Sequence, residues 1–299
     1  MASSAFPAAP APAADFAAPA APAASQRPAA PAHAGLGARR RGSMSPACAV
    51  GIEIAKMRRL RTLPVTLAFV AATIAMGSMS LFSESGRADL SDPAAMPWAS
   101  LLLNLGLVSA LTGPILMSVL ASRQTDIEHS GSGWNLASTL GLTPGALCRV
   151  KLAALSAVII PAILLQVAGL MAVARLMGLS VPMDVAPWAA YTLLLIAVNI
   201  AVCSFHIWLA AVVDNQIVVV GVGLLGSFIS LYMLLAPGWL ARLVPWGYYA
   251  VITPAKVTYD GQTAAFTYIE MPWGWAVGFL ALAGLAFAAL TRRLDRIER

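Results

Sequence analysis

Six long apolar segments constrain this chain more than any other feature of its sequence. They occupy residues 63–82, 98–121, 150–177, 188–213, 216–236 and 273–290. A membrane-spanning helix needs about 20 apolar residues, and each segment is close to or above that length. Charged residues make up only 11% of the chain, too few to cover the surface of a soluble domain. We therefore expect an all-α integral membrane protein with six transmembrane helices.

The distribution of basic residues predicts the orientation of these helices. Eight Lys and Arg residues precede the first segment, three lie in residues 122–152 at the connection of the second and third segments, and four follow the last. The other four of the nineteen lie in the alternate loops. Because cytoplasmic loops carry the excess of Lys and Arg, both termini are expected in the cytoplasm. The net charge of +6 is therefore interpreted as a topology signal, and no nucleic-acid partner is expected.

Residues 1–46 differ in composition from the rest of the chain. Ala and Pro dominate them, and three arginines follow at 39–41 without the preceding apolar core of a secretory signal. Proline at this density prevents helix propagation, so we expect a disordered cytoplasmic tail. Residues 47–299 would form the transmembrane domain. The alternative is that translation starts later, at Met44 or Met57.

A short basic stretch, residues 47–61, separates the tail from the first apolar segment. Val50, Ile54 and Met57 recur at helical spacing, and cationic side chains cluster just before the membrane. The charged residues of this stretch are Glu53, Lys56, Arg58, Arg59 and Arg61. Such a helix is expected to lie in the headgroup plane, with its cations near anionic lipids.

The last outer loop, residues 237–272, is long and rich in Trp and Tyr. Aromatic side chains favour the membrane–water interface, because the ring prefers apolar surroundings and its polar edge prefers water. Residues 239–252 are too few to span a bilayer and too apolar for open solvent. They predict an interfacial or re-entrant helix.

The sequence offers little for chemistry within the chain. There is no Gly-Lys dipeptide and hence no phosphate-binding loop for ATP. The GVGLLG run at Gly221–Gly226 lies inside an apolar segment, so it and the pair Gly274 and Gly278 are expected to serve close helix packing. Cys203 and His206 share a helix face but have no further metal ligands nearby in sequence. No metal site, cofactor or catalytic set is expected, and His206 is expected to make an interhelical hydrogen bond.

The polar stretch 122–152 interrupts the apolar segments on the side expected to face the cytoplasm. Its candidate partner-docking residues are Asp126, Glu128, His129, Gly133, Trp134, Leu136 and Leu140. Thr143 and Pro144 predict the N-cap and first turn of a helix that continues into the third segment. A large aromatic residue flanked by small residues and an acid suits docking into a partner's groove. The alternative is a solvated loop whose Trp134 folds back on the bilayer.

This stretch, DIEHSGSGWNLASTLGLTPGALCRVKL, resembles the segment between the second and third spans of ABC-2-type transporter permeases. It is most similar to the group linked to lantibiotic and peptide-antibiotic immunity. The start of the domain, Glu53 to Lys56 followed by Arg58 and Arg59, is similar to the acid-then-basic start of the same permeases. The resemblance covers about residues 47–299. The tail 1–46 is extra, and Gly141-Leu142-Thr143-Pro144 replaces the more usual Leu-Pro turn.

The resemblance implies a transport subunit that is not itself an enzyme. Residues 47–61 would be an elbow helix, and residues of about 126–141, within a coupling loop at 122–151, would seat on a separate cytosolic ABC ATPase. ATP and magnesium would bind that ATPase. The permease would pair as a homodimer or with a similar second permease in the bacterial inner membrane.

The exported substrate would be a peptide antibiotic, a drug or a lipid-like molecule, and the sequence does not choose among them. The sequence also leaves two other hypotheses open. One is a structural or sensory membrane protein that binds a cytosolic partner and transports nothing. The other is an intramembrane enzyme acting on lipid. The lack of carboxylates within the six segments argues against this hypothesis.

Overall fold

The computed structural model describes residues 45–260 and 263–297. Backbone contacts divide the chain after Arg41, and all the described residues belong to the second unit. Of the tail expected over residues 1–46, only Ser45 and Pro46 are described, and they start the first helix. The Ser45 hydroxyl accepts a hydrogen bond from the Cys48 amide at 3.3 Å. The rest of the tail prediction lies outside the described residues.

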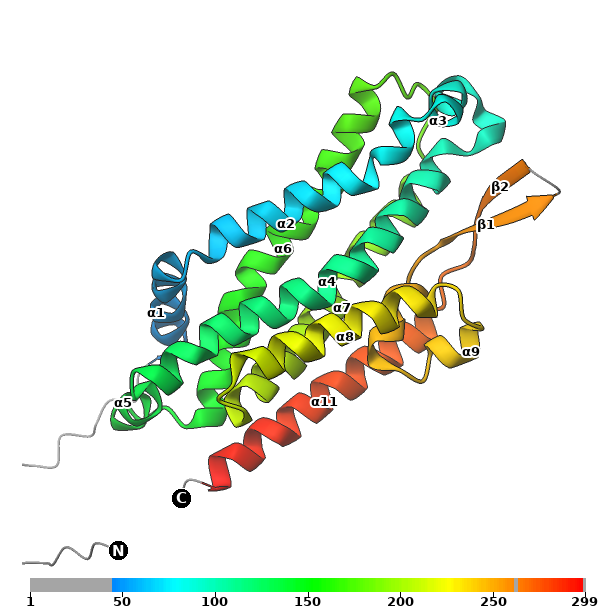
Figure 1. The fold of residues 1–299 in the computed structure, drawn as a ribbon. Coiled ribbons are helices and arrows are strands. Elements are labelled where there is room, and N and C mark those ends of the chain that lie inside the picture. The colour runs from blue at the N-terminus through cyan, green and yellow to red at the C-terminus, as the bar shows by residue number, and fades with distance from the viewer. Residues whose placement is uncertain (1–44, 261–262, 298–299) are drawn as a thin grey trace, which may run out of the picture. The chain divides into compact units, whose positions relative to one another are not determined.

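Helices dominate the described part of the chain (Figure 1). The long ones are α1 (Pro46–Arg59), α2 (Thr62–Gly77), α4 (Pro97–Ser130), α6 (Pro144–Leu176), α7 (Val185–Val212), α8 (Gln216–Met233) and α11 (Trp273–Ile297). Five of them, α4, α6, α7, α8 and α11, are long and apolar enough to cross a membrane. The bent pair of α1 and α2 makes a sixth when counted as one span. The prediction of an all-α integral membrane protein is confirmed.

Several helix ends differ from the predicted apolar segments. Helix α4 continues to Ser130, past the predicted end at residue 121, and α6 begins at Pro144 rather than residue 150. Hydropathy marks the apolar part of a helix, whereas backbone hydrogen bonding continues into its polar end. The start of α6 does follow the predicted capping pattern, because the Thr143 hydroxyl accepts from the Ala146 amide at 3.3 Å.

Helices α1 and α2 meet at a sharp joint. Their axes differ by 72°, and Arg61 between them adopts a left-handed conformation with φ of 50°. A non-glycine residue rarely adopts this conformation, so the joint is a defined turn rather than a curved helix. The Arg123 guanidinium reinforces it by donating to the Leu60 carbonyl at 2.5 Å. The expected amphipathic stretch is therefore a separate helix set at an angle to the first span.

Short elements connect the long helices. They are η1 (Met79–Phe82), α3 (Glu84–Ala88), η2 (Asp89–Ser91), η3 (Pro93–Ala95), α5 (Gly133–Thr139), α9 (Gly238–Ala241), η4 (Pro245–Gly247), α10 (Tyr248–Val251), β1 (Ala255–Asp260) and β2 (Thr263–Tyr268). Strands β1 and β2 form an antiparallel hairpin in which Val257 pairs with Phe266.

The single helix predicted within residues 237–272 is wrong. The segment folds as the short turns α9, η4 and α10, followed by the β1–β2 hairpin. The re-entrant part of the prediction has a counterpart, because Tyr249 is buried and its hydroxyl donates to Asn199 Oδ1 of α7 at 2.9 Å. Gly113 of α4 makes room for this ring, since a Cβ there would lie 2.7 Å from the Tyr249 ring.

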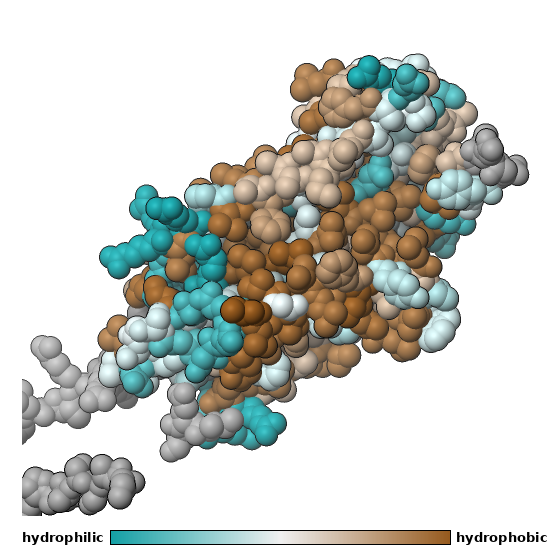
Figure 2. All heavy atoms as spheres, in the orientation of Figure 1, coloured by the Kyte–Doolittle hydropathy of each residue, from teal (hydrophilic) through white to brown (hydrophobic). Residues whose placement is uncertain are grey.

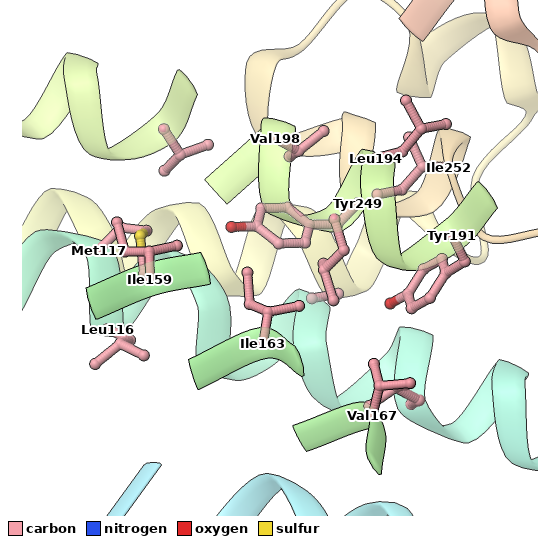
Figure 3. Close-up of a cluster of buried hydrophobic side chains, with 14 of the residues drawn as sticks. Leu116, Met117, Ile159, Ile163, Val167, Tyr191, Leu194, Val198, Tyr249 and Ile252 are labelled. Carbon is pink, nitrogen blue, oxygen red and sulfur yellow. The ribbon is translucent and has the colours of Figure 1, made fainter. Parts of the chain in front are cut away.

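The core of the bundle forms where α4, α6 and α7 meet the α10 segment. Figure 3 shows this cluster, with the Tyr249 ring among aliphatic side chains from three helices. Its labelled members are Leu116, Met117, Ile159, Ile163, Val167, Tyr191, Leu194, Val198, Tyr249 and Ile252. Helix α4 packs against α2, α7 and α8, so it is the central helix of the bundle.

The two ends of the bundle carry different elements. Helices α1 and α5 and the C-terminal end of α11 lie at one end, and α3, α9 and the hairpin lie at the other (Figure 1). We call these the α5 end and the hairpin end. Figure 2 shows hydrophobic residues over the middle of the visible face and hydrophilic residues gathered towards both ends. This is the distribution expected of a membrane-spanning bundle.

Two expectations about small and polar residues need correction. Gly223 and Gly226 do pack closely, because a Cβ would collide with Ser118 and with Trp246. Gly274 and Gly278, in contrast, meet nothing within 4 Å of such a Cβ, so they do not pack helices within this chain. The hydrogen bond expected of His206 is also not formed, since neither ring nitrogen has a partner among residues 45–260 and 263–297.

Candidate functional site

The polar stretch between α4 and α6 folds as two helical parts. Asp126, Glu128 and His129 lie on the last turns of α4, which ends at Ser130. Helix α5 then covers only Gly133–Thr139. The expected docking helix of about residues 126–141 is therefore wrong as one element. The break falls at Gly131 and Ser132, where Ser132 adopts a left-handed conformation with φ of 52°.

A buried cluster of charges joins three helices beneath α5. Lys151 of α6 places its Nζ 2.7 Å from Glu53 Oε2 of α1 and 2.8 Å from Glu128 Oε1 of α4. Lys56 of α1 contacts the same two residues, at 2.6 Å from Glu53 Oε1 and 2.7 Å from Glu128 Oε1. Gln124 completes the network by donating to Glu53 Oε2 at 2.8 Å. We call Glu53, Lys56, Gln124, Glu128 and Lys151 the ion cluster.

Because the ion cluster is buried, its positive and negative charges must compensate one another. Glu53 and Glu128 are 2% and 3% exposed, and Lys151 is fully buried. Removing a charge from water costs several kcal/mol unless partners replace its hydration. Here two carboxylates face two ammonium groups, so the charges cancel and each carboxylate has hydrogen-bond donors. The cluster therefore holds α1 against α4 and α6 without an uncompensated buried charge.

The pKa values in α1 reflect these contacts. Burial alone would raise the pKa of Glu53, but the charge of Lys151 and hydrogen bonds from Lys151, Lys56 and Gln124 outweigh it, so that pKa is lowered. Burial would likewise lower the pKa of Lys56, but hydrogen bonds to Glu128 and Glu53 and the charges of both carboxylates outweigh it, so that pKa is raised. Both residues are thus held in their charged forms.

The cluster corrects the docking assignment of Glu128 and places the carboxylate of the elbow residue Glu53 inside the protein. Both carboxylates are almost fully buried against Lys56 and Lys151, so they are not exposed docking contacts. Gly133 also has a packing role, because a Cβ there would collide with the Glu128 carboxylate. The first residue of α5 thus rests directly on the ion cluster. The elbow residues Arg58 and Arg59 are exposed, and the predicted docking residue Asp126 is half-buried.

His129 and Trp134 connect α5 to the turn between α7 and α8. Nε2 of His129 lies 2.9 Å from the Ala210 carbonyl oxygen, which can only accept, so Nε2 carries a proton. Nδ1 lies 3.3 Å from the Trp134 indole nitrogen and 2.9 Å from Asp214 Oδ1. The indole can only donate and the carboxylate can only accept. Nδ1 without a proton therefore accepts from Trp134, whereas Nδ1 with a proton donates to Asp214. Trp134 is therefore turned towards His129 and only partly exposed.

A groove opens between α1 and α5 above the ion cluster. Its volume is about 260 Å³, and Glu53, Lys56 and Glu128 contribute to its lining. Ile52 of α1 and Leu136 and Leu140 around α5 also line it, and these three side chains are 42%, 64% and 49% exposed. We call it the α1–α5 groove. An apolar rim over a polar floor, at the polar end of a membrane bundle, is a surface suited to an apolar partner side chain.

The C-terminal helix reaches the same end of the bundle. Asp295 of α11 accepts from the Gly145 amide at 2.8 Å and pairs with Arg149 at 3.4 Å. Arg149 also donates to the Thr291 hydroxyl at 3.0 Å. These contacts fix the start of α6 to the end of α11, so α11 is also connected to the elements around α5.

The roles of Gln124 and Lys151 in the ion cluster are not predicted from the sequence. Lys151 lies 98 residues from Glu53 in the chain, and nothing local pairs them. The available signal was the position of Lys151 at the entry of an apolar segment, where an ionisable side chain requires a partner. Two acids near other segment ends, Glu53 and Glu128, were the natural candidates. No three His, Cys, Asp or Glu side chains of the described residues are placed to hold a metal ion.

Comparison with known families gives one match. The model of the ABC-2 family transporter proteins matches residues 49–230, which include most of α1, the ion cluster and α5. No individual curated protein matches the chain significantly. The matched region covers more than half of the chain and agrees with the multi-span helical fold. This chain therefore belongs to the ABC-2 family of transporter proteins.

Proposed function

We propose that this chain is the permease subunit of an ATP-driven exporter in the bacterial inner membrane. A separate cytosolic ATPase, carrying ATP and magnesium, docks on the α1–α5 groove. The observation that carries this proposal is the exposure of Leu136 on α5 and of Leu140 just after it, at the polar end of the bundle. Exposed leucines at that end face water rather than lipid, so a partner that covers them gains free energy by removing apolar surface from water.

Helix α5 is placed to pass a movement of the ATPase into the membrane. Its first residue rests on Glu128, and the ion cluster joins Glu128 to α1 and α6. The Trp134–His129 contact leads to the end of α7 at Ala210. A displacement of α5 therefore acts on several helices together, as expected of an element that shifts a permease between inward-facing and outward-facing states.

The permease works as a pair, either with itself or with a similar second chain. Closed two-fold pairing is the commonest assembly among soluble oligomers, and we adopt it for this permease. The α5 end faces the cytoplasm, consistent with the excess of Lys and Arg there. In this arrangement α1 lies as an elbow helix in the inner headgroup region. The substrate belongs to the class of peptide antibiotics, drugs or lipid-like molecules.

Paired substitutions on α5 test the docking surface. Leu136→Ser with Leu140→Ser removes two exposed apolar side chains without touching the ion cluster. We expect membrane levels to be unchanged and co-purification of a co-expressed cytosolic ABC ATPase to fall more than tenfold, which is about 1.4 kcal/mol or more. Leu243→Ser is the matched control, because Leu243 is 70% exposed but lies beyond α9, at the hairpin end.

The outcomes separate docking from transport. Unchanged co-purification of the ATPase with the double variant would show that docking occurs elsewhere. A second outcome is that the double variant loses co-purification, but deletion of the chain changes neither efflux nor resistance. That outcome would support a structural or sensory protein that binds a partner and transports nothing. A Glu128 substitution cannot serve here, because it leaves buried charges unpaired and confounds docking with folding.

A further inference from the structure

A second cavity among the described residues lies away from the α1–α5 groove. It has a volume of about 490 Å³ and lies between α7, α11 and the segment 242–248. Aromatic side chains form much of its wall, with Phe205 of α7 in edge contact with Trp246 at 5.8 Å between ring centroids. Tyr248 stacks on Phe279 of α11 at 3.9 Å. We call it the α7–α11 cavity.

The cavity is elongated along α11. The α11 residues that line it recur on one face from Trp275 to Leu290. Fifteen residues of helix rise about 22 Å. One leaflet contributes roughly half of the 30 Å hydrocarbon core, so the cavity is long enough for a complete acyl chain. Small residues keep it open, since a Cβ at Gly278 would meet nothing within 4 Å.

One cation marks an end of this apolar cavity. The Arg242 guanidinium lies over the Trp275 ring, 5.1 Å from its centroid, and Arg242 lines the cavity. No carboxylate of residues 45–260 or 263–297 lies within ion-pair distance of Arg242 among the contacts of this chain. A single unneutralised cation beside a long apolar channel is complementary to a molecule with one anionic head and an aliphatic chain.

We propose that the α7–α11 cavity binds an anionic phospholipid of the surrounding bilayer. Its phosphate contacts Arg242 at the hairpin end, and one acyl chain lies along α11 between Trp275 and Leu290. The lipid fills the space that Gly278 and its small neighbours leave, so it attaches α11 to α7 in addition to their direct contacts. This site is independent of partner docking at the α5 end.

Native mass spectrometry of the purified full-length chain tests the proposal. The probes are phosphatidylglycerol and phosphatidylcholine of the same acyl length, added to delipidated protein. We expect one tightly retained phosphatidylglycerol per chain. Arg242→Gln should weaken its retention about fivefold, the effect of roughly one basic residue on an anionic headgroup. Ala283→Phe, which places a ring in the cavity, should reduce retention of both lipids.

Arg175→Gln is the matched control, because Arg175 also lies over a tryptophan, 5.0 Å from the Trp98 centroid, but does not line the cavity. Equal loss in the two arginine variants, or equal retention of both lipids by the wild type, would overturn the proposal. A second copy of the chain is the rival occupant. Efficient disulfide cross-linking between two copies of a Cys48→Ser, Leu282→Cys variant, with exclusion of lipid, would assign the cavity to a protein interface instead.

Discussion

At the scale of single residues, Lys151 has the greatest consequence for this fold. Its side chain has no exposed surface, and its ammonium group contacts Glu53, Glu128 and the Gln124 carbonyl oxygen, the last at 2.8 Å. A buried ion pair adds little stability compared with apolar residues, but removing one partner leaves an uncompensated charge. Lys151 is therefore needed mainly to neutralise the buried carboxylates of Glu53 and Glu128.

Lys151→Met should destabilise the protein by about 3–5 kcal/mol, because two buried carboxylates would then share Lys56 alone. Thermal unfolding of the detergent-purified protein measures this. Arg149→Met, two residues earlier and 44% exposed, should cost less than about 1 kcal/mol. Glu128→Gln combined with Lys151→Met restores neutrality and should recover part of the loss. An unfolding temperature of Lys151→Met equal to that of the wild type would contradict the role of the cluster.

At the scale of elements, α1 is held by charge more than by apolar packing. Ile52 and Ile54 on this helix are exposed, and Ala49 and Met57 are its buried apolar contacts. Glu53 and Lys56 supply the contacts to α4 and α6. The attachment of α1 should therefore depend on pH in a way that an apolar contact would not.

The sign of this dependence follows from the two shifted pKa values. The pKa of Glu53 lies below its ordinary 4.5, so its contribution is complete above 4.5 and is lost as the pH falls through the lowered value. The pKa of Lys56 lies above 10.5, so its contribution is complete below 10.5 and is lost as the pH rises through the raised value. A spin label at Ala55→Cys in a Cys48→Ser background should gain mobility beyond either limit. Glu53→Gln should abolish the acid transition, and a label whose mobility ignores pH would rule the mechanism out.

The sequence predicts the elements unevenly. Long apolar runs identify the spans, since a helix satisfies its backbone groups within a single segment of the chain. The Thr143–Pro144 cap is also predicted correctly. The β1–β2 hairpin and the turns before it are missed, because aromatic residues such as Tyr249 suit an interface and a buried core equally. Only some of the residues that line the α1–α5 groove are predicted from the sequence. Leu136 and Leu140 were identified, whereas the inward direction of Glu128 depends on Lys151, 23 residues away in the chain.

At the scale of the whole described unit, the two ends carry unequal charge. Most of the described Lys and Arg residues lie in α1, at the α4–α6 connection or near the end of α11, at the α5 end. The hairpin end carries Arg87, Arg175, Arg242 and Lys256. Charge asymmetry of this kind orients a membrane protein with its more basic end in the cytoplasm.

Cysteine labelling in intact cells checks this orientation. Cys48 is exposed on α1, and Cys148 and Cys203 are buried, so the wild type already carries one reporter at the α5 end. A membrane-impermeant maleimide should label it only after permeabilisation. Ser85→Cys in a Cys48→Ser background places the reporter on α3 and should be labelled in intact cells. The opposite pattern would reverse the topology and remove the cytoplasmic docking surface.

The ion cluster also sets an order of events during synthesis of the chain. Its members lie between residues 53 and 151, so they all emerge from the ribosome before α7. Until Lys151 appears, Glu53 and Glu128 have Lys56 as their single cationic partner within the cluster, and α1 lacks its attachment to the third span. Insertion of α6 then supplies the missing ammonium group. The residues that pair the buried charges of α1, α4 and α6 are thus all made before the second half of the protein.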